Sequence, residues 1–165
     1  MQRDSRFAAK LHFKYRADRL KNDDGKTILV KRPRIEVVFR KFSEHTVAGK
    51  NPEFRTHALV DSGADICFIP RAIANILQLD IDETSKKITV GAGGEFTTYR
   101  SKMYLEMVYK GQRIGVDTVD VAFPESDPSG VELERNILVG RSGLFTKYQI
   151  TFNDKQETLD FKKNS

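Results

Sequence analysis

The stretch from Phe54 to Pro70 constrains the fold of this chain more than any other segment. From Phe54 to Val60, every second residue falls on the same face, which predicts a strand with one buried side. A turn of small residues follows around Asp61, and a second apolar run, Ile66 to Ile69, must return into a core. The sequence therefore predicts a carboxylate held at a turn between two buried segments, which is how a scaffold fixes a functional group.

Two motifs in the chain belong together. The first is Asp61-Ser62-Gly63-Ala64-Asp65, and the second is the run Asn-Ile-Leu-Val-Gly-Arg at positions 136–141. In combination they resemble the active-site loop and the hydrophobic-hydrophobic-Gly-Arg element of the retropepsin-like aspartic proteases. An Asp-Ser-Gly triplet alone occurs in many unrelated loops, so the resemblance depends on the pair. It extends from about Ile28 to Phe161 and points to the single-domain bacterial or archaeal type, related to the retroviral proteases.

The resemblance implies a set of site residues. Asp61 would be the catalytic carboxylate, with its loop supported by Ser62, Gly63 and Ala64. The residues implied to bind substrate are Asp65, Gly91, Ala92, Gly93, Gly94 and Ile137, and those implied to support the site are Leu138, Val139, Gly140 and Arg141. Asp65 and Arg141 would form an ion pair beneath the loop. Leu138 and Val139 would pack under it, leaving Ile137 nearer the cleft.

The implied chemistry needs two carboxylates, but this chain carries one Asp-Ser-Gly. The resemblance therefore implies a homodimer in which two copies of Asp61 meet at a two-fold axis. Like charges at such a distance share one proton, so one carboxyl group can activate water while the other donates to the substrate carbonyl. The implied function is an aspartic endopeptidase acting on peptides or proteins. A catalytically inactive retropepsin-like module for peptide binding or dimerisation is the alternative.

Turn signals divide the rest of the chain into short strands, so a mostly β fold is expected. The predicted strands are 11–15, 27–30, 35–39 and 114–123, and the predicted hairpins are 88–108, with a glycine-rich tip at 91–94, and 149–161. Pro70 to Leu77 predicts a short helix, and Ser142 is a candidate cap for a second one that runs through Tyr148. The resemblance implies a closed or partly open retropepsin-like β-barrel, in which the 88–108 hairpin is a flap over the substrate.

Length and composition place further bounds on the chain. Its 165 residues suit one domain, with 1–27 as an N-terminal extension and strand and 28–161 as the core. The first ten residues contain no apolar segment typical of a signal peptide, and no apolar run approaches the ~20 residues that span a membrane. A single cysteine, Cys67, fits a buried position in a reducing, cytoplasmic protein.

The basic residues leave one further alternative open. The net charge is +5, with basic residues gathered at 31–34 and 40–41. They alternate with Ile35, Val37 and Phe39, so we interpret them as the solvated face of a sheet. A nucleic-acid-binding β domain would rest on net charge alone. His12, His45 and His57 lack ligand-like spacing, so neither a metal nor another cofactor is expected.

Overall fold

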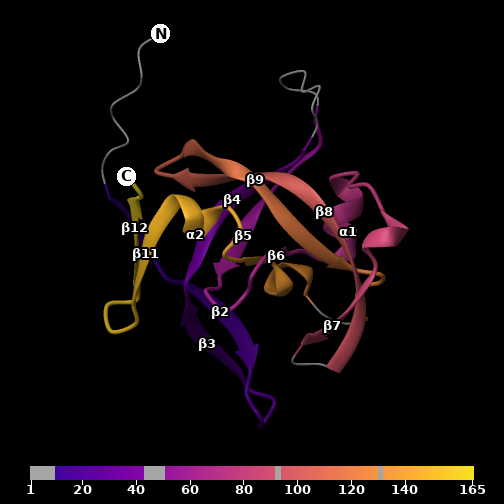
Figure 1. The fold of residues 1–165 in the computed structure, drawn as a ribbon. Coiled ribbons are helices and arrows are strands. Elements are labelled where there is room, and N and C mark those ends of the chain that lie inside the picture. The colour runs from indigo at the N-terminus through magenta and orange to yellow at the C-terminus, as the bar shows by residue number, and fades with distance from the viewer. Residues whose placement is uncertain (1–9, 43–50, 92–93, 130–131) are drawn as a thin grey trace.

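The computed structural model describes residues 10–42, 51–91, 94–129 and 132–165 (Figure 1). Its strands are β1 (Leu11–Lys14), β2 (Arg16–Lys21), β3 (Thr27–Arg32), β4 (Arg34–Lys41), β5 (Glu53–Val60), β6 (Cys67–Phe68), β7 (Lys87–Gly91), β8 (Gly94–Tyr109), β9 (Gln112–Pro124), β10 (Leu138–Val139), β11 (Tyr148–Asn153) and β12 (Thr158–Lys163). The helices are α1 (Arg71–Ile76) and α2 (Leu144–Lys147), with 3-10 turns η2 (Glu83–Ser85) and η3 (Leu133–Asn136).

Most of the strands form one closed sheet. Seven strands pair in the order β4-β5-β10-β6-β9-β8-β7, and β4 also pairs with β8. The extra pairing joins β4, β5, β10, β6, β9 and β8 into a barrel, and closure removes the free edges of these strands. Among the described residues β7 pairs only with β8 and forms an edge outside the ring. The predicted mostly β fold is confirmed, and the barrel is closed.

The long β8–β9 hairpin supplies much of the core. Met103, Leu105 and Met107 on β8 have no exposed surface, and Val119 and Val121 on β9 are equally buried. Successive side chains of a strand point to opposite faces, so every second residue enters the barrel. The same alternation confirms the pattern predicted for β5, where Thr56, Ala58 and Val60 are buried. The core therefore follows the period-2 pattern of the sequence.

Two smaller sheets flank the barrel. β1 pairs with β12, which pairs with β11, so the predicted opening strand and closing hairpin come together. The hydroxyl of Tyr15 ties them further by donating to Asp154 at 2.7 Å. β2 and β3 form a separate hairpin that projects from the barrel at the bottom of Figure 1. The sequence pattern misses β2, because its residues, RADRLK, show no apolar alternation.

The two helices differ in how they begin. The predicted range of α1 is confirmed, with Pro70 and Leu77 as its flanking caps. The carboxylate of Asp127 accepts from the backbone amides of Arg71 at 2.7 Å and Ala72 at 2.8 Å, which satisfies two free donors of the first turn. The prediction that Ser142 caps α2 is wrong. Its hydroxyl accepts from the amide of Asp120 on β9, and Gly143 is the N-cap residue instead.

Several predicted segments lie partly outside the described residues. They are the start of the N-terminal extension (1–9), Ala92 and Gly93 of the hairpin tip, and positions 43–50 and 130–131 of the predicted core. Among the residues that are described, no helix has both the length and the apolar character needed to cross a membrane.

Candidate active site

Asp61 lies at the turn that directly follows β5, with its side chain half-buried. Its amide donates to the carbonyl of Val139 at 3.0 Å, and its own carbonyl accepts from the amide of Ala64 at 3.4 Å. Its carboxylate oxygen Oδ1 accepts from the amide of Gly63 at 2.8 Å. Such a local bond from an Asp side chain stabilises a turn. The turn of small residues therefore orients the carboxylate at the end of the strand.

The strand that carries Asp61 is bonded on both sides. The amide of Leu59 donates to the carbonyl of Ile137 at 2.9 Å, and that of Val60 donates to the carbonyl of Pro33 at 2.8 Å. β10 runs parallel to β5 on one side, and β4 runs antiparallel to it on the other. Asp61 therefore leaves the barrel wall from an interior strand, whose backbone has little freedom to move.

Gly140 lets the second motif approach the Asp61 turn closely. A Cβ atom at this position would lie 2.4 Å from the carbonyl oxygen of Ile66 and 2.6 Å from that of Ala64. Both distances are far below normal contact. The close approach allows the amide of Arg141 to donate to the carbonyl of Ala64 at 2.8 Å, and that of Ser142 to the carbonyl of Asp65 at 2.9 Å. The two motifs thus meet through their backbones.

The structure reverses the predicted placement of Ile137 and Leu138. Ile137 is fully buried in the core, whereas Leu138 is partly exposed and lines a groove. Val139 is buried, as predicted. Neighbouring side chains of a strand face opposite sides, so Leu138 and Val139 do not both pack beneath the loop. The prediction that Ile137 lies nearer the cleft is therefore wrong, and Leu138 occupies that position.

The predicted ion pair between Asp65 and Arg141 does not form in this chain. Both side chains are exposed, and no ion pair between them occurs among the described residues. The two segments are instead held together by the backbone bonds that follow Gly140. Hydrogen bonds between backbones depend on the path of the chain and not on side-chain charge, so motif spacing alone could not distinguish the two arrangements.

A groove of about 980 Å³ runs beside the Asp61 turn. Ala64, Asp65 and Leu138 line it near the turn, and Val90 and Phe96 line it from the β7–β8 hairpin. The volume lies at the upper end of the range of ~300–1,000 Å³ that is usual for ligand sites. The lining does not include Asp61, so the groove passes along the carboxylate's turn without enclosing the carboxylate. Space for a ligand is therefore present beside the turn that carries the carboxylate.

The β7–β8 hairpin forms the opposite wall. Gly91 and Gly94 are its last paired residues, and Gly94 has a φ of +105°, which favours glycine. Midway along the hairpin, where Phe96 pairs with Thr89, the ring of Phe96 packs edge-on against that of Phe68 on β6, with centroids 6.0 Å apart. Ile88 is 72% exposed and Val90 is 75% exposed. The hairpin is thus fastened to β6 through Phe96, and its outer strand β7 presents two apolar side chains to solvent.

The remaining residues near the turn take different environments. Ser62 and Gly63 are exposed at its tip. Cys67 is fully buried, as predicted, and burial raises the pKa of its thiol to about 12. At that pKa the side chain behaves as a small apolar group. Within the described part of the chain, His, Cys, Asp and Glu side chains form no group that could hold a metal ion.

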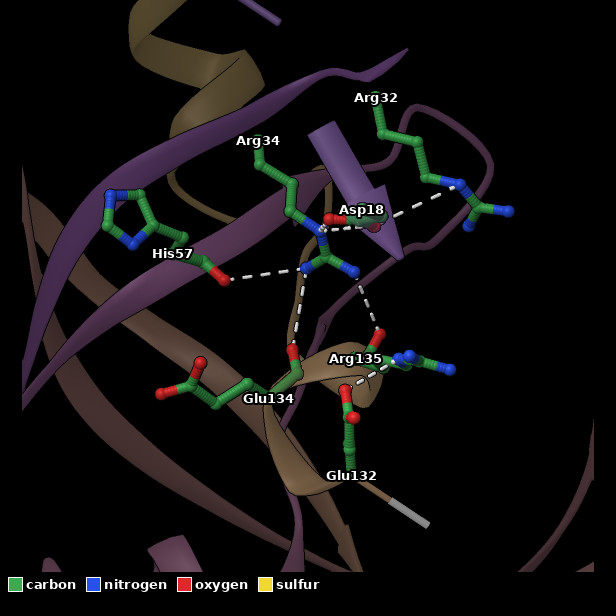
Figure 2. A network of polar contacts seen from close by, with 7 residues as sticks. All are labelled: Asp18, Arg32, Arg34, His57, Glu132, Glu134 and Arg135. Atoms are coloured by element: carbon green, nitrogen blue, oxygen red, sulfur yellow. Dashed lines mark hydrogen bonds and ion pairs between the residues drawn. The ribbon is translucent and has the colours of Figure 1, made fainter. Parts of the chain in front are cut away.

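Arg34 is the centre of a buried network that the sequence does not reveal (Figure 2). Its side chain is only 6% exposed, and its Nε donates to both carboxylate oxygens of Asp18, at 2.9 and 2.7 Å. Its terminal nitrogens donate to three backbone carbonyls, those of His57 and Glu134 at 3.4 Å and that of Arg135 at 3.1 Å. One guanidinium thus joins β2, β4, β5 and η3.

The solvated-face interpretation of the basic stretch 31–34 is therefore wrong for Arg34. Asp18 lies on a strand that the sequence pattern misses, and the carbonyl partners lie far along the chain. No local signal connects these groups. By holding the carbonyls of η3, Arg34 positions the segment that leads directly into β10 and so into the active-site wall.

Comparison with known proteins agrees with this geometry. Residues 44–138, more than half of the chain, match the aspartyl protease family, and the chain belongs to that family. The matched range contains the Asp61 turn and the β7–β8 hairpin and ends at Leu138. The resemblance drawn from the two motifs is therefore confirmed at the level of the family.

Two solved structures are similar to this chain. The first is the EIAV protease complexed with the inhibitor HBY-793, with 18% identity and a TM-score of 0.40, covering 67% of this chain and 83% of that one. The second is a retropepsin-like aspartic protease from Rickettsia conorii, with 14% identity and a TM-score of 0.47, covering 93% of this chain and 88% of that one. No curated protein matches the chain in sequence.

Proposed function

We propose that this chain is an aspartic endopeptidase that acts as a homodimer on peptide or protein substrates. The observation that carries the proposal is the Asp61 turn, where a half-buried carboxylate is oriented by the Gly63 amide beside a groove of about 980 Å³. Membership of the aspartyl protease family supports the same chemistry. The single buried cysteine supports a reducing, cytoplasmic setting.

The dimer follows from the number of carboxylates that the reaction needs. Two copies of Asp61 about a two-fold axis would share one proton, because two like charges at short distance do not both ionise. The ionised copy takes a proton from water as the water attacks the peptide carbonyl, while the neutral copy donates to that carbonyl. Ser62, exposed beside Asp61, would hydrogen-bond across the axis and stiffen the pair.

The β7–β8 hairpin would act as the cover of the site. It lines the groove opposite the Asp61 turn, and β7 is an edge strand outside the closed barrel. A bound peptide would lie between the turn and the hairpin, where the backbone of Gly91 and Gly94 offers groups for hydrogen bonds. The prediction that Ala92 and Gly93 contact the substrate belongs to the same proposal, and these two residues lie outside the part of the chain that the structure describes.

The central test compares the wild type with Asp61→Asn in a peptide-library digest from acidic to neutral pH. The amide is nearly isosteric but does not take up the proton of water, so we expect cleavage to fall by about 10²–10⁴ or more. Circular dichroism and light scattering should show the same fold and oligomeric state for both proteins. A wild type that binds library peptides without cleaving them would instead identify a non-catalytic module.

The dimer has its own test. When wild-type and Asp61→Asn chains are mixed under conditions that exchange subunits, a mixed dimer has one competent carboxylate and should be severely impaired. Activity should then fall as roughly the square of the wild-type fraction. A linear fall would show that each chain acts alone, and the shared-carboxylate mechanism would have to be abandoned.

A further inference from the structure

Two arginines lie together at one end of the groove. Arg32, the last residue of β3, and Arg135, in η3, both line it, close to Leu138 and Asn136. In Figure 2 their guanidinium groups extend to the same side of the buried Arg34 network. They come from segments about a hundred residues apart, which the barrel brings to one wall. This end of the groove is therefore positively charged.

Each arginine has only a weak ion-pair partner. Asp18 is the acidic neighbour of Arg32, but both of its oxygens are taken by Arg34, and Arg32 approaches it only to 4.0 Å. Arg135 pairs with Glu132 at 2.8 Å, but the Glu132 side chain is 73% exposed. A surface pair of this kind contributes little free energy and competes poorly with a bound ligand. Both guanidinium groups keep donors for a further acceptor.

The backbone that carries these arginines is fixed. Arg34 donates to the carbonyl of Arg135 itself at 3.1 Å, and it lies two positions after Arg32, with Pro33 between them. The carbonyl of Pro33 is in turn bonded to the amide of Val60, next to Asp61. The two cations are thus held relative to the catalytic turn, and such preorganisation lowers the entropic cost of binding a ligand.

Two other acidic groups that line the groove are already engaged. Glu125 accepts from the ammonium of Lys86 at 3.1 Å, and Asp127 accepts from the first amides of α1. Asp65 lines the groove beside Ala64 with its side chain exposed, so it opposes an acidic ligand there. Glu95 and Arg100 also line the groove, so its lining carries charges of both signs, and Arg32 and Arg135 are the two arginines that lie near each other within it.

We propose that Arg32 and Arg135 bind an acidic side chain, Asp or Glu, of the peptide substrate. The inference rests on the proposed endopeptidase function and names the substrate class of the same groove. A carboxylate matches the planar array of guanidinium donors, and two arginines can hold its two oxygens together. The net charge of +5 also favours the approach of acidic peptides to the protein.

The preference can be measured without catalysis. Asp61→Asn protein is applied to an array of short synthetic peptides in which Glu, Gln and Lys are exchanged at every position. We expect Glu to bind about 3- to 10-fold better than Gln at one position, with the difference shrinking as salt is added. Binding without preference for Glu over Gln at any position would overturn the proposal, even if the wild type proves to be a protease.

Variants assign the preference to these residues. Arg32→Gln and Arg135→Gln should each reduce it, and Arg135→Glu should reverse it in favour of Lys, a gain that misfolding does not produce. Asp65→Asn should strengthen it. The matched control is Arg55→Gln, since Arg55 is an exposed arginine paired with Glu36 and does not line the groove.

The same variants separate two further outcomes. If the arginine variants weaken the dimer in light scattering and leave peptide preference intact, the arginines belong to the subunit interface and the proposal is wrong. If peptides bind with the expected preference but the wild type cleaves none, the acidic site stands and the endopeptidase proposal fails. If both proposals hold, the library peptides that the wild type cleaves should carry Asp or Glu at the position where the array shows the preference.

Discussion

The two walls of the groove are built in opposite ways. The Asp61 turn is bonded to β10 and the following residues through Val139, Ala64 and Asp65, and it sits at the end of an interior strand. In the β7–β8 hairpin, β8 belongs to the closed barrel, whereas the outer strand β7 lies outside it and exposes Ile88 and Val90. A catalytic group must keep its geometry, whereas a cover must admit and release substrate. In the proposed function, the first wall would hold the catalytic group in position and the second would adapt to the substrate.

Their glycines show the same contrast. Gly140 is required because two carbonyl oxygens occupy the space of a side chain, while Gly94 is required for its φ of +105°, with open space around it. The first constraint comes from packing between distant segments, and the second from the local turn. Substitutions at Gly140 and Gly94 should therefore differ in how much they destabilise the protein and in how far the effect spreads.

The largest effect is expected from Gly140→Ala. A Cβ atom 2.4 Å from the carbonyl oxygen of Ile66 forces the second motif away from the Asp61 turn and strains the bonds of Arg141 and Ser142. We expect a loss of about 4 kcal/mol in the free energy of unfolding, among the large values for single substitutions. Urea denaturation measures it. A loss below about 1 kcal/mol would show that the wall formed by the Asp61 turn and β10 relaxes easily.

The next effect is expected from Arg34→Leu. The substitution leaves the Asp18 carboxylate, whose side chain is 12% exposed, without its main partner and frees three carbonyls. Removing one member of a buried ion pair should cost about 3 kcal/mol. The double variant Asp18→Leu with Arg34→Leu should recover part of the loss, because no uncompensated charge remains. Additive losses in the double variant would contradict the pairing.

A smaller effect is expected from Gly94→Ala. Alanine at this positive φ costs about 1–2 kcal/mol, but nothing within 4 Å would clash with its Cβ. The strain is confined to the hairpin, so hydrogen exchange should speed up in β7 and the start of β8 while the barrel amides keep their protection. Uniformly faster exchange through β5 and β10 would show that the two walls are coupled.

The smallest effect is expected in the pH dependence of stability and involves His57, on the strand β5 that carries Asp61. Burial, helped by the nearby charge of Arg16, lowers the pKa of His57 below its ordinary value of 6.5, and Arg16 donates to its neutral ring nitrogen Nε2 at 2.6 Å. The unfolded chain therefore binds more protons than the native one below about pH 6.5, and stability falls as the pH drops through this window. Thermal melts of His57→Gln should show a shallower fall than the wild type. An equally steep fall would exclude His57 as the cause.

Local patterns in the sequence predict much of this protein correctly. Alternation fixes the buried face of β5, Pro70 marks the start of α1, and the small residues after Asp61 predict the turn that orients it. These features depend on residues that are neighbours in the chain, whose conformational preferences act over a few positions. The pair of motifs likewise identifies the family, because each motif is short and continuous.

What only the tertiary structure decided is how distant segments meet. The register of β10 between β5 and β6 turns Leu138 to the groove and Ile137 to the core. Closure of the barrel buries Arg34 against Asp18 and η3, and backbone bonds after Gly140 replace the expected pair of Asp65 and Arg141. Long-range pairing depends on which backbone donors and acceptors the whole fold leaves free, and a local sequence pattern does not specify these groups.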